Sequence, residues 1–230
     1  MVFPKLLITI VLASVLFFFI YESEGVSYSF GSHIGDHGVD TTSFDNQKVN
    51  LSVYYDSLSQ SCAIFIVKDL QNILFFNDLI SIVNLQLVPW ASAYVDNAKK
   101  SIWCQNGPDE CKLNSVESCA INLWHKVDMH YGLISCSEFH VIERRTQMWM
   151  DCINELNLPK ESIVMCINRG KGTELGMKYI NETGQLYPRP AIVPWVVVNN
   201  QPIGKDYANF THYVCKAYKG VTVPKICNEV

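Results

Sequence analysis

Apolar and polar residues alternate between positions 49 and 55, and this period of two predicts a β-strand with one face on a core. The apolar positions are Val49, Leu51, Val53 and Tyr55. Beyond the polar turn Ser59-Gln60-Ser61, apolar residues recur three or four positions apart, which predicts an amphipathic helix. That set comprises Cys62, Phe65, Ile66, Leu70, Ile73 and Leu74. The turn therefore joins a strand to a helix.

The rest of the chain continues to interleave strand and helix patterns. Ile80–Val88 predicts a second strand, which Pro89 ends. Ala191–Asn200 predicts a third, with a hairpin turn at Asn199-Asn200-Gln201-Pro202. Helical periodicity covers 114–157 as one or two helices and recurs over Ile163–Ile167, Thr173–Gly184 and Asp206–Tyr218. This order of elements predicts an α/β fold.

Residues 1–25 have the layout of a secretory signal peptide. Lys5 precedes the apolar run Leu6–Ile20, which is short for a membrane span, and polar residues follow it. An uncleaved anchor is the alternative, because no small-x-small cleavage site is evident. Residues 26–46 are rich in Gly, Ser, Asp and Thr and predict a linker or propeptide. The main domain is expected over 47–230, without a membrane contact after signal cleavage.

Composition and charge narrow the class of partner. With 49% hydrophobic and 17% charged residues, the 230-residue chain is neither disordered nor fibrous, and it suffices for one large domain or two small ones. A net charge of -4 gives no reason to expect nucleic acid or an anionic membrane surface as a partner. Sequons at Asn50, Asn181 and Asn209 predict N-glycosylation on the secretory pathway.

Nine cysteines predict a disulfide framework with one thiol left over. Eight of them can form four bridges: Cys104, Cys111, Cys119, Cys136, Cys152, Cys166, Cys215 and Cys227. Their pairing is open among 105 combinations, although Cys215 and Cys227 are close enough in sequence to suggest one pair. Zinc at Cys104, Cys111 and Cys119 is a weaker alternative, because their spacing is wide and an oxidising compartment favours bridges. We therefore expect no metal and no cofactor.

The leftover thiol is expected at Cys62, in the turn between the first strand and the helix. A strand, a turn with two cysteines two residues apart and a helix form the redox site of thioredoxin-like proteins. Here Ser59 stands where the attacking sulfur would be, and only the second cysteine is present. The alternative is an ordinary helix cap, in which Ser59 or Ser61 accepts from the first-turn amides.

Val193-Pro194 stands at the start of the third strand, and a cis peptide bond is predicted there. In thioredoxin-like folds a cis-proline loop packs against the redox turn and presents its backbone to an extended substrate. The alternative is a plain edge strand with a trans proline.

The segment Cys104-Gln105-Asn106-Gly107-Pro108-Asp109-Glu110-Cys111, continued through Asn114 to Cys119, resembles the signature C-Q-H-G-x-x-E-C-x-x-N-x-x-x-x-C. This is the signature of the gamma-interferon-inducible lysosomal thiol reductase family. The turn segment Tyr54–Cys62 and the segment Val193–Val196 also resemble that family's active-site and proline segments. The similarity runs from Val49 to Cys227, with Asn106 in place of the signature histidine.

The resemblance implies a thioredoxin-like fold with a helical, disulfide-bonded insertion over about 100–185. It implies thiol-disulfide oxidoreductase activity on protein disulfides, with Ser59 and Cys62 at the catalytic positions and Val193 and Pro194 at the substrate. The expected partners are disulfide-containing or unfolded polypeptides and a small thiol reductant. The expected location is a lysosome or vacuole, or outside the cell.

Ser59 in place of the nucleophile divides the functional hypotheses. A serine hydroxyl cannot form the mixed disulfide through which reduction passes, and Cys62 alone lacks a resolving partner. The first hypothesis is a thiol-disulfide oxidoreductase with an impaired dithiol mechanism. The alternative is a redox-inactive, peptide-binding or chaperone-like glycoprotein on the same scaffold.

Overall fold

The computed structural model describes residues 48–98 and 101–229. The signal peptide predicted at 1–25 and the linker or propeptide predicted at 26–46 lie outside these residues. Among the helices described, none combines the length and the apolar character that crossing a membrane requires.

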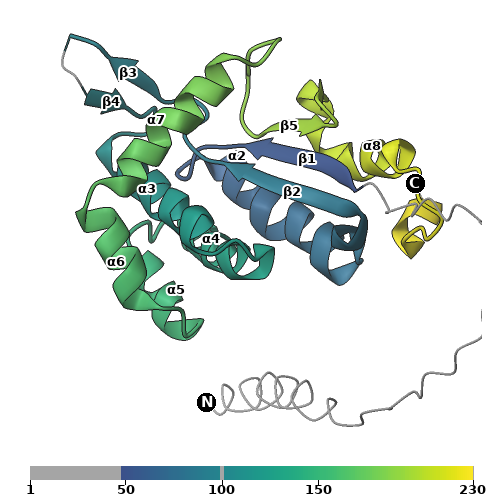
Figure 1. Ribbon diagram of the computed structural model, residues 1–230, viewed down its shortest axis with the longest axis horizontal. Coiled ribbons are helices and arrows are strands. Elements are labelled where there is room, and N and C mark those ends of the chain that lie inside the picture. The colour runs from purple at the N-terminus through teal and green to yellow at the C-terminus, as the bar shows by residue number, and fades with distance from the viewer. Residues whose placement is uncertain (1–47, 99–100, 230) are drawn as a thin grey trace, which may run out of the picture. The chain divides into compact units, whose positions relative to one another are not determined.

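A four-stranded sheet lies at the centre of the described chain, in the order β2-β1-β5-β6 (Figure 1). β1 (Val49–Tyr54) pairs in parallel with β2 (Val83–Val88) and antiparallel with β5 (Trp195–Val198). β5 turns into the short β6 (Gln201–Pro202) through two asparagines with positive φ, which confirms the predicted hairpin. β1 is thus an interior strand, flanked by one strand that follows it closely and another from near the end of the chain.

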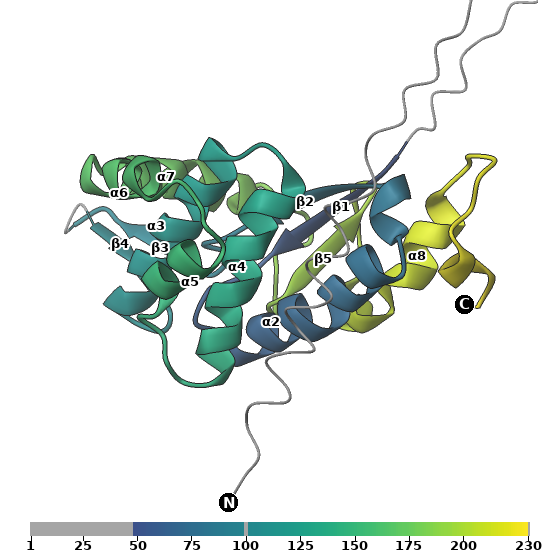
Figure 2. The same ribbon diagram turned by 90° about the horizontal axis from the view of Figure 1, so that it is seen from below.

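Alternation along the strands sends side chains to two different cores. Leu51, Val53 and Val196 belong to the larger core, which the helix after the turn, α4 (Val127–Ile142) and the C-terminal helix cover. Tyr54 and Trp195 point to the opposite face and pack with Tyr179 of α7 (Lys171–Gly184). Viewed from below, α2 (Gln60–Ile64) lies along the sheet that includes β1 and β5 (Figure 2). The two-residue period of the first strand therefore places one of its faces on the larger core, as predicted.

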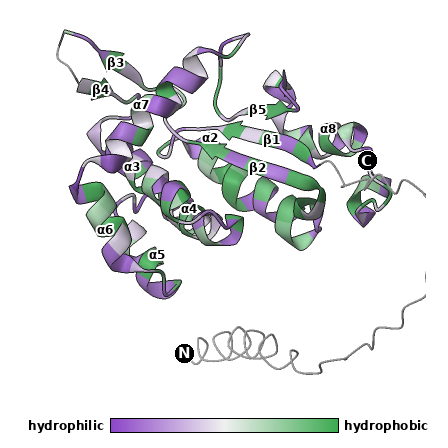
Figure 3. Cartoon of the chain, in the orientation of Figure 1, coloured by the Kyte–Doolittle hydropathy of each residue, from purple (hydrophilic) through white to green (hydrophobic). Residues whose placement is uncertain are grey.

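The helix after the turn begins as α2 (Gln60–Ile64) and continues through two π-helical segments, η2 (Phe65–Leu70) and η3 (Asn72–Phe76). Its apolar side is fully buried at Phe65, Ile66, Leu70 and Leu74. Colouring by hydropathy shows how much of this helix and of the strands above it is apolar, whereas α6 and α7 carry more polar residues (Figure 3). This helix therefore contributes its apolar side to the larger core.

Five helices lie between the second and third strands of the main sheet. They are α3 (Pro108–Leu123), α4 (Val127–Ile142), α5 (Trp149–Glu155), α6 (Lys160–Asn168) and α7 (Lys171–Gly184). α3, α4, α5 and α6 form a core of their own, which includes Ala63 of α2, whereas α7 packs with Trp90 and Trp195 on the other face of the sheet. A separate two-stranded hairpin, β3 (Tyr94–Asp96) with β4 (Ser101–Trp103), precedes them, and the sequence patterns did not predict it.

Several predicted boundaries are wrong. The region 114–157, predicted as one or two helices, contains parts of three, and the first of them already begins at Pro108. The next two helices begin at Lys160 and Lys171, before the predicted Ile163 and Thr173. Leu79–Ile82 forms a 3-10 turn, η4, so the second strand begins at Val83 and not at Ile80. The third strand begins at Trp195, because residues 191–194 form bends around Pro194. The final helix is α8 (Phe210–Ala217), and the residues before it form the 3-10 segment η5 (Gly204–Asn209). A last 3-10 turn, η6 (Lys225–Asn228), follows.

The predicted disulfide framework is present, with four bridges among the described residues. Three lie in the helical region, at Cys104–Cys111, Cys119–Cys166 and Cys136–Cys152. The fourth, Cys215–Cys227, is the pair suggested by proximity and ties η6 to α8. The longest bridge in sequence, Cys119–Cys166, spans 47 residues and joins α3 to α6. Disulfides therefore join α3 to α6 and α4 to α5.

α7 approaches α3 and the loop after β2 at two glycines spaced four residues apart. A Cβ on Gly172 would lie 2.9 Å from Cβ of Ser115 and closer still to the Ser115 carbonyl oxygen. A Cβ on Gly176 would lie 2.6 Å from the ring of Trp90, which is fully buried. The absence of a side chain at both positions sets how closely α7 packs.

We expect Gly172→Ala to lower the free energy of unfolding by about 1–3 kcal/mol, because the obstacle is backbone and the helices must move apart. Gly184→Ala, at the other end of α7, meets no atom within 4 Å and is the matched control. It should be neutral or slightly stabilising, by up to about 1 kcal/mol. Thermal and denaturant unfolding measure both. Equal stability of the two variants would contradict close packing at Gly172.

Candidate functional site

The turn between β1 and α2 places Ser59 and Cys62 at the start of a helix. Ser59 is the N-cap residue, and its carbonyl oxygen accepts from the Ala63 N–H at 2.9 Å. Its own N–H donates to the Asp56 carbonyl oxygen at 3.0 Å. The Ser59 hydroxyl makes no capping bond to the helix and instead lies 3.0 Å from the Ser61 hydroxyl. The alternative of a side-chain cap by Ser59 is therefore not what the structure shows.

The proline loop lies against this turn, although more than 130 residues separate them in sequence. The Ser61 hydroxyl donates to the Val193 carbonyl oxygen at 3.0 Å. The Val193-Pro194 peptide bond is cis, which confirms the predicted isomer. Pro194 is buried and Val193 is partly exposed. The structure thus brings together all the residues that the sequence assigned to catalysis and substrate: Ser59, Cys62, Val193 and Pro194.

Cys62 has a free thiol that is entirely buried. Burial is the main reason that its pKa is raised well above the ordinary value for a thiol, because a thiolate would be desolvated there. A hydrogen bond from the Ser59 hydroxyl lowers the pKa of the thiol in part, whereas the charges of Glu138 and Asp56 raise that pKa further. Cys62 is therefore a protonated thiol at neutral and acidic pH.

Three buried carboxyl groups at or near the turn have raised pKa values. Glu117 of α3 and Glu138 of α4 are both 0% exposed, and Asp56 is 1% exposed. Burial raises the pKa of Glu117 to about 8. Burial, followed by the charge of Glu117, raises the pKa of Glu138 well above its usual range. Burial also raises the pKa of Asp56 to about 6. At acidic pH this cluster is neutral.

Asp56 and Ser57 connect the turn to its neighbours. One carboxylate oxygen of Asp56 accepts from the Ser92 N–H at 2.9 Å. The Ser57 N–H donates to the side-chain oxygen of Asn114 at 3.1 Å, and the Ser57 hydroxyl donates to the Glu110 carbonyl oxygen at 3.3 Å. All of these residues lie in the loop after β2 or at the start of α3. The turn is therefore fixed from the inserted helix.

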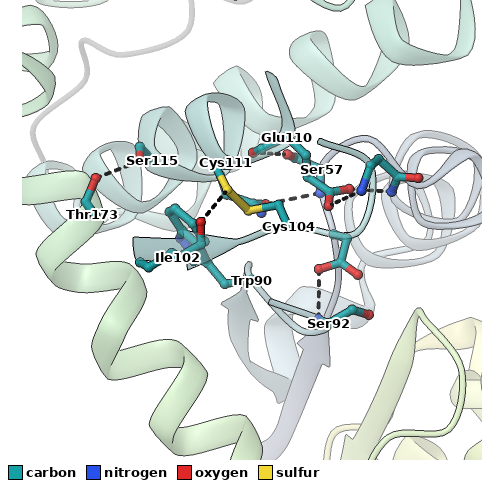
Figure 4. The surroundings of a disulfide bond; sticks show 12 residues. Ser57, Trp90, Ser92, Ile102, Cys104, Glu110, Cys111, Ser115 and Thr173 are labelled. Carbon is teal, nitrogen blue, oxygen red and sulfur yellow. Dashed lines mark hydrogen bonds between the residues drawn. A yellow bond between two sulfur atoms is a disulfide. The ribbon is translucent and has the colours of Figure 1, made fainter. Parts of the chain in front are cut away.

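The signature segment covers the loop before α3 and the first turns of that helix, and it supplies the two partners of Ser57, Glu110 and Asn114 (Figure 4). The Cys104–Cys111 disulfide closes the loop before α3 and brings Glu110 beside Ser57 (Figure 4). Ser115, one turn further along α3, reaches Thr173 of α7, with the hydroxyl oxygens 3.4 Å apart. The Trp90 indole N–H donates to the Ser118 hydroxyl at 2.8 Å. The signature residues therefore act as supports for the turn.

Asn106, which replaces the signature histidine, binds the side chain of Glu110. Its backbone N–H and its amide donate to the two carboxylate oxygens at 3.0 and 2.5 Å. The Glu110 carboxylate is 1% exposed and has these two donors from one residue. Asn106 thus acts as a neutral partner that satisfies a buried acid.

Sequence reasoning missed the buried carboxyl groups. Glu117 lies three to four positions from Leu113 and Ala120, so it occupies the same helix face as buried apolar residues. An acidic residue at such a core position is the signal that could have identified it. Its neighbour Glu138 lies on α4, and the spacing of residues within one helix cannot predict a contact between side chains of two helices.

The remaining candidate residues are cysteines in disulfides and the sequon asparagines. Cys104, Cys111 and Cys119, the alternative zinc ligands, are divided between two different disulfides. The three sequon asparagines, Asn50, Asn181 and Asn209, are exposed. Their side chains are therefore open to solvent, and glycosylation stays a prediction.

Two solved structures share the arrangement of elements. Oxidised BdbD from Bacillus subtilis matches with a TM-score of 0.54 and 13% identity, over 76% of this chain and 90% of that one. MdbA from Actinomyces oris matches with a TM-score of 0.51 and 14% identity, over 76% and 84%. At such low identity these similarities establish the fold alone. They confirm the predicted thioredoxin-like fold with a helical, disulfide-bonded insertion.

Sequence comparison identifies the family. Residues 50–156 match the profile described as gamma interferon inducible lysosomal thiol reductase (GILT). The gamma-interferon-responsive lysosomal thiol protein of Arabidopsis thaliana is 36% identical over 186 residues, 79% of this chain and 76% of that protein. The gamma-interferon-inducible lysosomal thiol reductase of Mus musculus is 31% identical over 185 residues, 79% and 73%. This chain therefore belongs to the gamma interferon inducible lysosomal thiol reductase family.

Proposed function

We propose that this protein binds disulfide-containing or unfolded polypeptides at the Ser59–Cys62 turn and the Val193-Pro194 loop, as a thiol-disulfide oxidoreductase with an impaired dithiol mechanism. The observation that carries this proposal is the position of Ser59. It is the partly exposed N-cap residue of α2, three residues before a buried thiol and linked through Ser61 to the proline loop. In this proposal Val193 and Pro194 receive the substrate, and the hydroxyl of Ser59 stands in place of the sulfur that would attack a disulfide.

The chemistry of the two positions explains the impairment. In a dithiol mechanism the first thiolate attacks a substrate sulfur, and the second thiolate then attacks the mixed disulfide and releases the reduced substrate. Oxygen at position 59 cannot form that intermediate. Cys62 is placed for the second step only, since its sulfur is buried and its pKa is raised by burial. A buried protonated thiol is a poor nucleophile for an external disulfide.

A second candidate function follows from the same burial. If Cys62 never reaches a substrate, the protein is a redox-inactive, peptide-binding or chaperone-like protein that holds polypeptide beside Val193. The complete burial of the Cys62 thiol favours this candidate over exchange through a single thiol. The two candidates share the binding surface and differ in whether a covalent bond to sulfur ever forms.

We further propose that the protein works in an acidic compartment of the secretory pathway, a lysosome or vacuole, or is secreted. The family name and the disulfide framework support the secretory route. The buried carboxyl groups support the acidic compartment, because Glu117, Glu138 and Asp56 are neutral, and so compatible with burial, at low pH. Membership in this family alone leaves the final destination open.

Restoring the missing sulfur is the sharpest test of the proposed impairment. We expect Ser59→Cys to raise the reduction of a protein disulfide at acidic pH by roughly 100-fold or more, because the new thiol meets its resolving partner Cys62. Ser61→Cys is the matched control: it adds an exposed thiol to the same turn at the wrong spacing, and it should give little turnover. A Ser59→Cys variant no more active than Ser61→Cys would show that the site has lost more than one atom.

Covalent trapping separates the two candidate functions. Wild-type protein is incubated with an unfolded polypeptide that carries an activated disulfide, and adducts are mapped by mass spectrometry. Because the Cys62 thiol is buried, we expect no adduct in the native protein and one after denaturation, while non-covalent binding is unchanged in Cys62→Ala. An adduct at Cys62 under native conditions would instead favour single-thiol exchange.

The buried carboxyl groups predict greatest stability at acidic pH. A carboxyl whose pKa rises on folding binds its proton more tightly in the folded state, so its contribution is complete below the unfolded pKa. For Glu117 this stabilisation is lost as the pH rises from about 4.5 to about 8. We expect the melting temperature to fall on the order of 5 °C over this range.

Two variants locate the cause of that pH dependence. Glu117→Gln removes one of the titrating groups and should make the curve less steep, whereas Glu161→Gln, at an exposed position, should leave it unchanged. Differential scanning calorimetry at several pH values provides the measurement. A melting temperature that rises between pH 5 and pH 8 would contradict the assignment.

A further inference from the structure

One cluster of metal-ligand side chains lies outside the turn, between α4 and α5. Cys136 and His140 are four residues apart on α4 and therefore share a face of that helix. Cys152 reaches the same place from α5. One ligand atom from each of the three residues lies within 4.8 Å of the other two. Within the part of the chain that the structure describes, no other three His, Cys, Asp or Glu side chains meet this condition.

His140 is the unexplained member of this cluster. Its side chain is 92% buried, yet neither ring nitrogen has a hydrogen-bond partner among the described residues. A buried imidazole without a partner costs free energy, so such a group calls for a physical reason. Its neighbours here are two sulfur atoms, which form the Cys136–Cys152 disulfide. Nitrogen and thiolate sulfur together are the ligands that zinc prefers.

We propose that Cys136, His140 and Cys152 form a redox-controlled site for a thiophilic divalent cation such as Zn²⁺. In the oxidised protein the disulfide excludes the ion. Opening of the disulfide by a small dithiol creates a three-ligand site of two thiolates and one imidazole. This cation site is independent of the Ser59–Cys62 turn and of the function proposed for it.

Reduction of the disulfide comes before metal binding. The dithiol transfers two electrons and two protons to the Cys136–Cys152 bond, which becomes two thiols, while the dithiol closes to a cyclic disulfide. Zn²⁺ then forms two Zn–S bonds, and the two thiol protons leave to solvent. Neutral His140 contributes a lone pair from one ring nitrogen and releases no proton. A fourth position remains for water or a small ligand, as in zinc sites with three protein ligands.

The spacing of the helices suits such an ion. With Zn–S bonds of about 2.3 Å and a Zn–N bond of about 2.0–2.1 Å, tetrahedral angles require ligand atoms about 3.6–3.8 Å apart. The Cα atoms of Cys136 and Cys152 lie 5.8 Å apart, so once the disulfide is open the sulfurs can separate by side-chain rotation. Cys136 is partly exposed, which gives a dithiol access to one sulfur.

The test is metal binding by the full chain after controlled reduction. Oxidised protein is treated with limiting dithiothreitol and desalted without oxygen, and opening of Cys136–Cys152 is verified by alkylation and peptide mapping. Zn²⁺ binding is measured by calorimetry. Co²⁺ serves as the spectroscopic probe, because thiolate ligation gives charge-transfer bands. We expect about one ion per reduced chain and none in the oxidised chain.

Variants separate this site from metal binding at other thiols. His140→Leu should weaken Zn²⁺ binding by at least about tenfold and change the Co²⁺ spectrum, and Cys136→Ser with Cys152→Ser should abolish this site. His125→Leu, which removes an exposed histidine, is the matched control and should bind as the wild type does. Equal affinity of His140→Leu and wild type would overturn the proposal. So would a Cys136–Cys152 bond that cannot be opened while circular dichroism stays native.

Discussion

The hydrogen bonds between Ser57 and the start of α3 are the constraint on which the site depends. The Ser57 N–H and hydroxyl donate to Asn114 and to the Glu110 carbonyl oxygen, all of them buried. Backbone groups in a turn cannot satisfy themselves as those in a helix do, and leaving them buried without partners is costly. The inserted helix supplies the partners. The turn is therefore shaped by residues more than 50 positions later in the chain.

This dependence explains why the signature segment is distant from the chemistry and still belongs to the site. Its disulfide, Cys104–Cys111, fixes the loop that presents Glu110, and Asn106 satisfies the carboxylate of that residue. The consequence is a turn whose geometry does not rely on the side chain at position 59. A thiol there and a hydroxyl there would be held by the same contacts, since the bonds that fix the turn come from Asp56 and Ser57.

Much of the main sheet and the identity of the site were predictable from sequence, because their signals are local. The period of two in β1, the helical period after Cys62 and the asparagine turn at Asn199 each depend on neighbours within a few residues. The predicted start of β2 was wrong because the apolar residues of Leu79–Ile82 are compatible with a strand and with a 3-10 turn. The left-handed backbone of Asp78 leads into the 3-10 turn, and the residue type alone does not reveal that conformation.

Contacts between segments that are distant in sequence could not be predicted. Glu117 and Glu138 lie on different helices, so their mutual effect on pKa exists only after α3 and α4 pack. The pairing of Cys119 with Cys166 and of Cys136 with Cys152 likewise depends on which helices become neighbours. The cis Val193-Pro194 bond was predicted from a proline at the start of a β-branched strand, and it is confirmed. Local propensity alone favours the trans form.

The position of β1 between β2 and β5 has a consequence for synthesis of the protein. β2 ends 34 residues after β1 ends, but β5 follows only after five further helices. Until then one edge of β1 offers unpaired N–H and C=O groups, which is the surface on which strands of separate chains associate. This edge of a nascent chain therefore stays open to association for longer than the edge of a strand whose sheet closes in sequence order.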